Sequence, residues 1–153
     1  MPNTYSQAYT HVVFAVKYWE NMITREWRDE LHQYISGIIT NEGAKSLAVG
    51  GWLDHVHIFF GQPVTTSVAN LVRVVKTNSS KWINEKGFVQ WKFRWQEGYG
   101  AFTYALSERD TVIRYIMNQE IHHQKNSFRQ EYVELLNEFE ISYDEKYLFE
   151  FYE

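Results

Sequence analysis

Apolar residues recur with two different periods along this chain, and each period predicts its own kind of element. Short runs rich in β-branched and aromatic residues predict strands at residues 9–17, 45–51, 54–61 and 101–105. Apolar positions spaced three and four apart predict helices over residues 24–41, 67–85 and 107–122, and a last helix from residue 126 or 127 to 138. Ser107 followed by Asp110 is typical of a capped start to the third helix.

The order of these elements predicts the fold. Strand, helix, strand, strand, helix, strand is the βαββαβ arrangement of a ferredoxin-like fold, an α+β fold with one antiparallel sheet. We expect helices on one face of that sheet and an added C-terminal helix from residue 107. The first and third strands are central in this topology, so residues 54–61 lie in the middle of the sheet. The 153 residues contain no repeat or linker and predict a single domain.

Composition narrows the class of protein. Hydrophobic residues make up 44% of the chain and aromatic residues 18%, which favours a packed core over disorder. There is no run of 18 apolar residues, and the first residues lack the basic start and apolar stretch of a signal peptide. The chain has no cysteine, which excludes disulfides and thiolate metal sites. We therefore expect a cytoplasmic protein without a membrane span.

The net charge of −4 is unevenly distributed along the sequence. Residues 73–129 contain 10 Lys and Arg against 5 Asp and Glu, whereas residues 130–153 contain 1 against 8. Binding depends on the local field of a surface, so the basic segment with its interleaved aromatic residues is a candidate for contacts to nucleic acid. The candidate residues are Arg73, Lys76, Lys81, Arg94 and Trp95. The alternative is a solvated helix face followed by aromatic residues of the core.

Two histidines form the most informative local pattern. His55 and His57 flank Val56 in the third predicted strand, and side chains in a strand alternate between its two faces. The imidazoles therefore point to the same side, about 6.5–7 Å apart along the strand, where they can bind one divalent cation. A strand that only packs would carry apolar residues there, because a buried imidazole needs hydrogen-bond partners. The alternative is one core histidine and one histidine at the strand end.

The helix predicted over residues 107–122 has polar groups opposite its apolar side. At 100° per residue, the apolar side is formed by Ile113, Ile116 and Met117. The roughly opposite side is formed by Tyr115, Gln119 and His122. Because Tyr115 and Gln119 are one turn apart, they can face one target. The phenol is a candidate nucleophile, and the amide oxygen is a candidate metal ligand.

The triplet His55-Val56-His57 and the segment Tyr115-Ile116-Met117-Asn118-Gln119, on a ferredoxin-like frame, closely resemble one family. This family is that of the HUH single-tyrosine transposases of small bacterial insertion sequences. The REP-associated tyrosine transposases are its close relatives. Residues 10–14, 51–54, 93–102 and 118–125 also agree with its pattern. The resemblance covers about residues 5–132 and implies that residues 1–153 form a single HUH transposase domain, with an acidic tail at residues 133–153.

This resemblance implies a DNA transposase that cleaves and rejoins single-stranded DNA at hairpin-marked element ends. Tyr115 would be the nucleophile that forms a covalent 5′-phosphotyrosine link, and His55, His57 and Gln119 would bind a divalent metal, Mg²⁺ or Mn²⁺. A cation suits this chemistry because it offsets the charge of the phosphodiester and orients it for attack. The resemblance also implies a homodimer with shared sites, in which the tyrosine helix of one chain docks on the histidine pair of the other.

Three other interpretations of the sequence remain open. A domesticated relative would process chromosomal repeat hairpins without mobilising an element. A non-catalytic module that binds single-stranded nucleic acid would use the exposed aromatic residues of a ferredoxin-like sheet. A metal-dependent hydrolase would use water as the nucleophile and leave no protein–DNA adduct.

Overall fold

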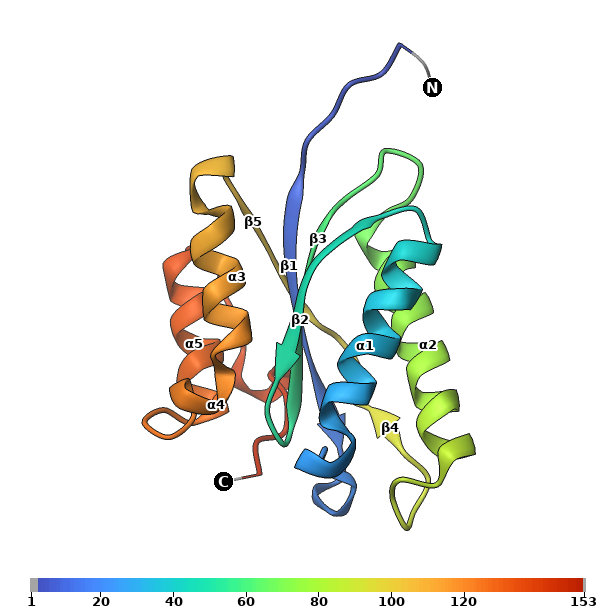
Figure 1. Ribbon diagram of the computed structural model, residues 1–153. Helices are drawn as coiled ribbons and strands as arrows, with labels where there is room; N and C mark the ends of the chain where they lie inside the picture. Colours follow the sequence, from blue (N-terminus) through green and yellow to red (C-terminus); the bar gives the residue numbers. More distant parts are fainter. Residues whose placement is uncertain (1–2, 153) are drawn as a thin grey trace.

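The computed structural model describes residues 3–152 as one antiparallel sheet with helices on both faces (Figure 1). The strands are β1 (Tyr9–Lys17), β2 (Lys45–Gly51), β3 (His55–Gly61), β4 (Arg94–Trp95) and β5 (Gly100–Tyr104). The helices are α1 (Arg25–Asn41), α2 (Val68–Lys86), α3 (Arg109–Met117), α4 (Gln119–His122) and α5 (Phe128–Glu138). Within the described residues, no helix combines the length and the apolar character that crossing a membrane requires.

The sheet confirms the expected ferredoxin-like α+β fold. Its strand order is β2-β3-β1-β4, and β5 also pairs with β1, so β1 and β3 are central. All pairings are antiparallel, and the β1–β3 register places Val13 opposite His57 and Ala15 opposite His55. The histidine pair therefore lies on the most constrained part of the sheet, where neighbouring strands fix the backbone on both sides.

Two local features differ from the sequence prediction. β4 was not predicted, because a two-residue strand paired only with the end of β1 has no measurable period. The helix expected over residues 107–122 is interrupted at Asn118, whose φ of −106° and ψ of 26° end α3 before α4 begins. The capped start at Ser107 is also wrong. Ser107 lies in a short 3₁₀ turn, and no described side chain caps α3, which starts after Glu108.

The alternation of β3 divides its side chains between two layers. Val56 and Ile58 face the core formed with α1 and α2, while His55 and His57 face the layer that contains α3, α4 and α5. Figure 1 shows α1 and α2 on one side of the sheet and α3, α4 and α5 on the other. Helices thus cover both faces, and the second layer encloses the histidines.

The acidic tail returns to this second layer. Phe149 is buried and packs against Phe128 and Tyr132 of α5. The Gln96 side chain holds the tail backbone at Glu150: its Oε1 accepts from the Glu150 amide at 2.8 Å, and its Nε2 donates to the Glu150 carbonyl at 2.9 Å. The packing of Phe149 and the hydrogen bonds of Gln96 therefore hold α5 in place on the sheet.

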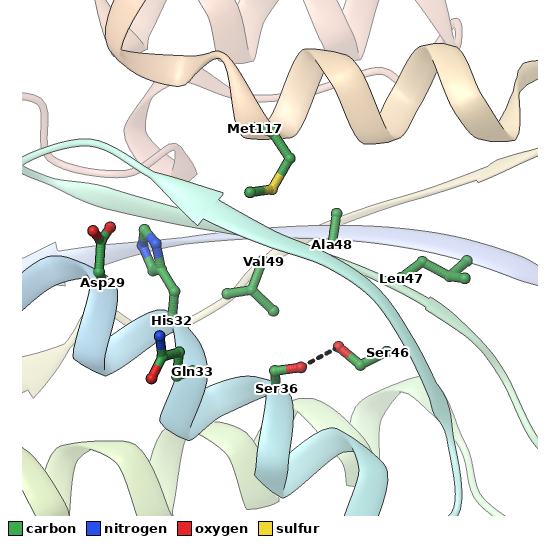
Figure 2. Close-up of a pocket in the computed structure, with 9 residues that line it drawn as sticks. All are labelled: Asp29, His32, Gln33, Ser36, Ser46, Leu47, Ala48, Val49 and Met117. Atoms are coloured by element: carbon green, nitrogen blue, oxygen red, sulfur yellow. Dashed lines mark hydrogen bonds between the residues drawn. The ribbon is translucent and has the colours of Figure 1, made fainter.

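A groove of about 460 Å³ runs beside β2, which is an edge strand (Figure 2). Among the described residues β2 pairs only with β3. Figure 2 shows Met117 on one side of this edge and the α1 side chains on the other, where the Ser36 and Ser46 hydroxyls are 2.7 Å apart. Met117 was expected on the packed side of its helix, but it is 61% exposed here. An edge strand with free backbone groups is a natural pairing surface for another strand.

Gly50 allows α3 to approach the sheet closely. A Cβ atom at this position would lie 2.3 Å from the backbone oxygen of Ile116, which is an impossible contact. Gly50 is also the β2 partner of His57. The absence of a side chain at Gly50 therefore lets α3, which carries Tyr115, pack closely on β2 beside His57.

We expect Gly50→Ala to lower the free energy of unfolding by about 1–3 kcal/mol, because the methyl group forces α3 away from β2. The matched control is Gly37→Ala in α1, where a Cβ meets nothing within 4 Å among the described residues. This control should raise stability by about 0.5–1 kcal/mol through helix propensity. Urea denaturation of the three proteins measures both effects, and an unchanged midpoint for Gly50→Ala would contradict the close approach.

Candidate functional site

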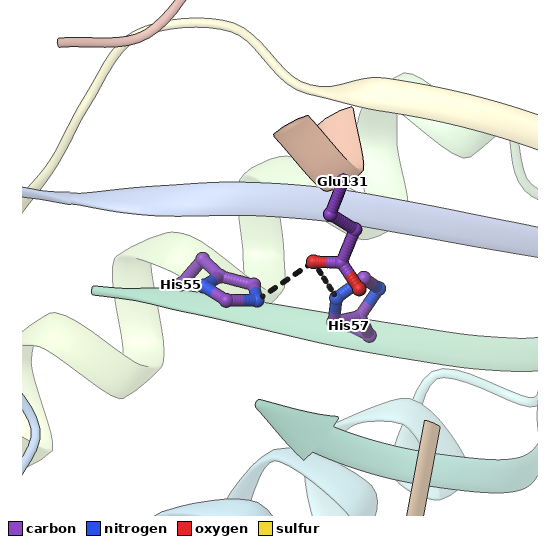
Figure 3. Close-up of side chains that lie close together, drawn as sticks. All are labelled: His55, His57 and Glu131. Carbon is purple, nitrogen blue, oxygen red and sulfur yellow. Dashed lines mark hydrogen bonds and ion pairs between the residues drawn. The ribbon is translucent and has the colours of Figure 1, made fainter. Parts of the chain in front are cut away.

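His55 and His57 converge on a carboxylate from a distant part of the chain. Both imidazoles are fully buried. Their Nε2 atoms lie 3.1 and 3.2 Å from Oε1 of Glu131 in α5 (Figure 3). The three ligand atoms lie within 4.8 Å of one another. The expectation that the two histidines face one point is thus met, and the point they face is occupied by a carboxylate oxygen.

The outer nitrogens of both imidazoles are held by hydrogen bonds. His55 Nδ1 lies 2.7 Å from Asp54 Oδ1. Because a carboxylate accepts, this Nδ1 carries the proton. His57 Nδ1 lies 2.8 Å from His11 Nε2, and His11 Nδ1 lies 3.4 Å from the Tyr104 hydroxyl. Holding the outer nitrogen fixes the ring and directs Nε2 inward, which is how proteins orient histidines that bind metals.

Glu131 was missed by the sequence prediction, although a signal was present. It is only 2% exposed, and it lies on the buried side of α5. The other members of that side are Phe128, Tyr132, Leu135 and Leu136. A carboxylate at an apolar helix position is unusual, because an unpaired buried charge is costly. Its partners come from β3, α3 and α4, and no local pattern in α5 reveals them.

Tyr115 and Gln119 join the same carboxylate from the other side. The Tyr115 hydroxyl and the Gln119 amide both donate to Glu131 Oε2, the amide at 2.9 Å. Gln119 Oε1 lies 3.1 Å from His55 Nε2. The four residues named from the sequence are therefore brought together by Glu131. All four belong to the single chain that the structure describes, and exchange of the Tyr115 helix between two chains of a homodimer stays a prediction.

The buried charges shift the pKa values of the site in opposite directions. Burial lowers the pKa of His55, but hydrogen bonds to Asp54 and Glu131 outweigh it and raise this pKa to about 9. Burial also opposes ionisation of Glu131, yet His57, His123 and His55 hold the pKa of this carboxyl far below its usual range. Burial and the adjacent Glu131 charge raise the pKa of Tyr115. The site thus favours a carboxylate beside positive charge and a protonated phenol.

The donor set fits a divalent cation. A neutral His55 with its proton on Nδ1 would direct a lone pair at two oxygens, Glu131 Oε1 and Gln119 Oε1. This arrangement of acceptors needs a positive charge at its centre, which either a proton on His55 or a bound cation supplies. Imidazole, carboxylate and amide ligands suit Mn²⁺ and related ions, and Mg²⁺ is the harder, oxygen-preferring option.

The five candidate DNA contacts lie in different environments. Arg73, Lys81 and Arg94 are exposed. Lys76 is half-buried, and its amine donates to the backbone carbonyls of Gln96 and Gly98 at 2.8 and 2.7 Å. Trp95 is 9% exposed and its indole donates to Ser79 at 2.9 Å. Trp95 therefore packs in the core, in agreement with the alternative interpretation, and stacking on a base would require it to leave that core.

Comparisons with known proteins show that the chain is similar to transposases. A family model described as "Transposase IS200 like" matches residues 4–119. Among solved structures, a candidate transposase from Deinococcus radiodurans is similar with a TM-score of 0.60 and 21% identity, covering 76% of this chain and 94% of its own. A REP-associated tyrosine transposase bound to a REP hairpin is similar with a TM-score of 0.58 and 11% identity, covering 79% of this chain and 72% of its own. No curated protein matches significantly.

We expect Glu131→Gln to destabilise the metal-free protein by about 3–5 kcal/mol, because it removes one partner from a buried charged network. Glu134→Gln is the matched control, since Glu134 is exposed one turn further along α5 and should stay within about 0.5 kcal/mol of the parent. Denaturation with a chelator present measures both. Equal effects of the two substitutions would show that the Glu131 charge does not organise the site.

Proposed function

Because the chain belongs to the family of IS200-like transposases, we propose that it cleaves and rejoins single-stranded DNA through a covalent link to Tyr115. The observation that carries this proposal is the convergence of the Tyr115 hydroxyl and two imidazoles on the carboxylate of Glu131. A nucleophile beside a cation-binding group is the arrangement that phosphoryl transfer requires. The REP hairpin in the neighbouring solved structure supports hairpin-marked ends as the substrate.

The reaction replaces one phosphoester bond by another. The Tyr115 oxygen attacks the phosphorus, the bond from phosphorus to the 3′ oxygen breaks, and the 3′ oxygen takes up a proton from water and leaves as a hydroxyl. Glu131 Oε2 accepts the hydrogen bond of the Tyr115 hydroxyl and orients it. Because the histidines keep this carboxyl ionised, the Tyr115 proton is released to water. The 5′ phosphate stays on Tyr115 until another 3′ hydroxyl attacks it, so the link conserves the bond energy for rejoining without a nucleotide cofactor.

We assign His55, His57 and Gln119 to the metal, as the family resemblance implies, and add Glu131 as a carboxylate ligand. When bound, Mg²⁺ or Mn²⁺ would supply positive charge to a non-bridging phosphate oxygen. The protein residues hold the imidazoles in place through Asp54 and His11. The exposed Arg73, Lys81 and Arg94 would bind DNA phosphates, a contribution that weakens as salt rises.

We propose a homodimer in which each chain has its own complete site. Strand transfer needs two DNA ends, and a two-fold dimer provides two sites. The edge strand β2, with the groove beside it, is the surface on which a second copy would pair. Tyr115 lies on the histidines of its own chain, so this dimer has no need to share sites between chains.

We expect Tyr115→Phe to abolish covalent adduct formation on single-stranded DNA while leaving DNA affinity nearly intact, since only the attacking oxygen is removed. The measurement is a denaturing gel after incubation with hairpin-containing DNA and Mn²⁺. Tyr99→Phe, in an exposed loop position, is the control and should form adduct as the parent does. Free 5′ phosphate without adduct in the parent protein would instead identify a hydrolase.

We expect His55→Ala and His57→Ala to reduce Mn²⁺ affinity more than Gln119→Ala does, because imidazole is the stronger ligand for this ion. Calorimetric titrations of the three variants give the ranking. Equal losses in all three would contradict it.

Mixed dimers test where the site is assembled. His55→Ala and Tyr115→Phe chains are each inactive by themselves. If every site is built within one chain, a mixture of the two stays inactive, and this is the result that we expect. If sites are shared between chains, one of the two sites in each mixed dimer has both an intact His55 and an intact Tyr115, and cleavage activity would return.

A further inference from the structure

Two more histidines surround Glu131, and the proposed reaction does not use them. His122 is the last residue of α4, and His123 follows it as the C-cap residue. His123 Nε2 lies 3.2 Å from Glu131 Oε1, and His122 Nε2 lies 3.4 Å from Glu131 Oε2. The ligand atoms of His122, His123 and Glu131 lie within 4.8 Å of one another, as do those of His55, His57 and Glu131. Glu131 is the one member that both groups have in common.

The hydrogen bonds of His123 leave a lone pair facing oxygen atoms. His123 Nδ1 lies 2.8 Å from the backbone oxygen of Asn126, which can only accept, so Nδ1 carries the proton. In the neutral ring, Nε2 then presents a lone pair to Gln119 Oε1 at 2.8 Å and to Glu131 Oε1 at 3.2 Å. Rotating the Gln119 amide does not relieve this contact, because its nitrogen already donates to Glu131. Three acceptors that meet in this way require a positive charge between them, which either a proton on His123 Nε2 or a bound cation supplies.

His122 provides a second observation, independent of the first. Its Nε2 atom is buried and has no hydrogen-bond partner among residues 3–152. The same atom points toward Glu131 Oε2, which also accepts from Tyr115. A buried ring nitrogen without a partner is costly to leave in that state. A cation beside this nitrogen would satisfy it.

Cations have a route to this group. A cavity of about 280 Å³ is lined by Tyr115, His122 and Glu131, together with Glu108, Glu134 and Glu138. Several carboxylates around one opening create a negative field that concentrates cations there. The cavity reaches the tyrosine side of Glu131, away from the groove beside β2.

We propose that His122, His123 and Glu131 form a second divalent-cation site beside Tyr115, bridged through Glu131 to the site of His55 and His57. A carboxylate shared by two ions about 3.5–4 Å apart is the usual link in two-metal sites that act on phosphodiesters. The inference rests on the proposed function only in that it uses the same carboxylate. Mixed imidazole and carboxylate ligands suit Mn²⁺, which is therefore the probe.

The experiment counts Mn²⁺ ions on the full chain in the absence of DNA. Calorimetry should give two Mn²⁺ per chain, and low-temperature electron paramagnetic resonance should show a spin-coupled pair. His123→Ala and His122→Ala should each keep one ion, lose the coupling, and weaken the second binding step by at least the roughly 10–100-fold that loss of a supporting residue costs a metal site. His32→Ala is the matched control, because His32 lies in α1 and should keep both ions.

One Mn²⁺ per chain in the parent protein would overturn the second site, and so would two ions that persist in both His122→Ala and His123→Ala. The parent count decides the matter even where a variant folds poorly, and His123→Gln gives a replacement closer in size. The failures of the two proposals are distinguishable on the same preparation. One bound ion with normal adduct formation refutes only the second site, whereas two bound ions without any adduct refute only the strand-transfer reaction.

Discussion

The buried carboxylate of Glu131 is the constraint on which the functional half of the molecule depends. It is 2% exposed, and a charge at that depth is stable only with positive or donating partners around it. Those partners are the imidazoles of His55 and His57 on one oxygen and the Tyr115 hydroxyl on the other. Strand β3, helix α3 and helix α5 must therefore keep a fixed relation, because a shift of any one of them leaves the carboxylate unpaired.

Each of these three elements is positioned by a simple feature of the chain. β3 is central in the sheet, so its register is fixed from both sides. α3 lies close to β2 because Gly50 has no side chain to hold it away. α5 packs against Phe149, and Gln96 holds the tail that contains Phe149 through hydrogen bonds to its backbone. The acidic tail thus contributes to the position of Glu131.

The sequence predicts the features that depend on the period of its apolar residues and on the spacing of residues that are close along the chain. The outlines of β1, β3, α1 and α2, the shared face of His55 and His57, and the pairing of Tyr115 with Gln119 all follow from it. It does not predict contacts between segments far apart in the chain, and so it misses Glu131, which meets the histidine strand only after folding. Trp95 shows a further limit: an aromatic residue beside Arg94 suggests base stacking, but the structure buries its side chain, and the indole donates to Ser79.

Cation binding and the nucleophile are coupled because they share one side chain. Oε1 of Glu131 faces the imidazoles, and Oε2 accepts from Tyr115. Any ligand that draws the carboxylate toward the histidines changes the hydrogen bond of the phenol at the same time. In the homodimer that we propose, each chain would build this arrangement by itself, and pairing between copies would serve to hold two DNA ends together.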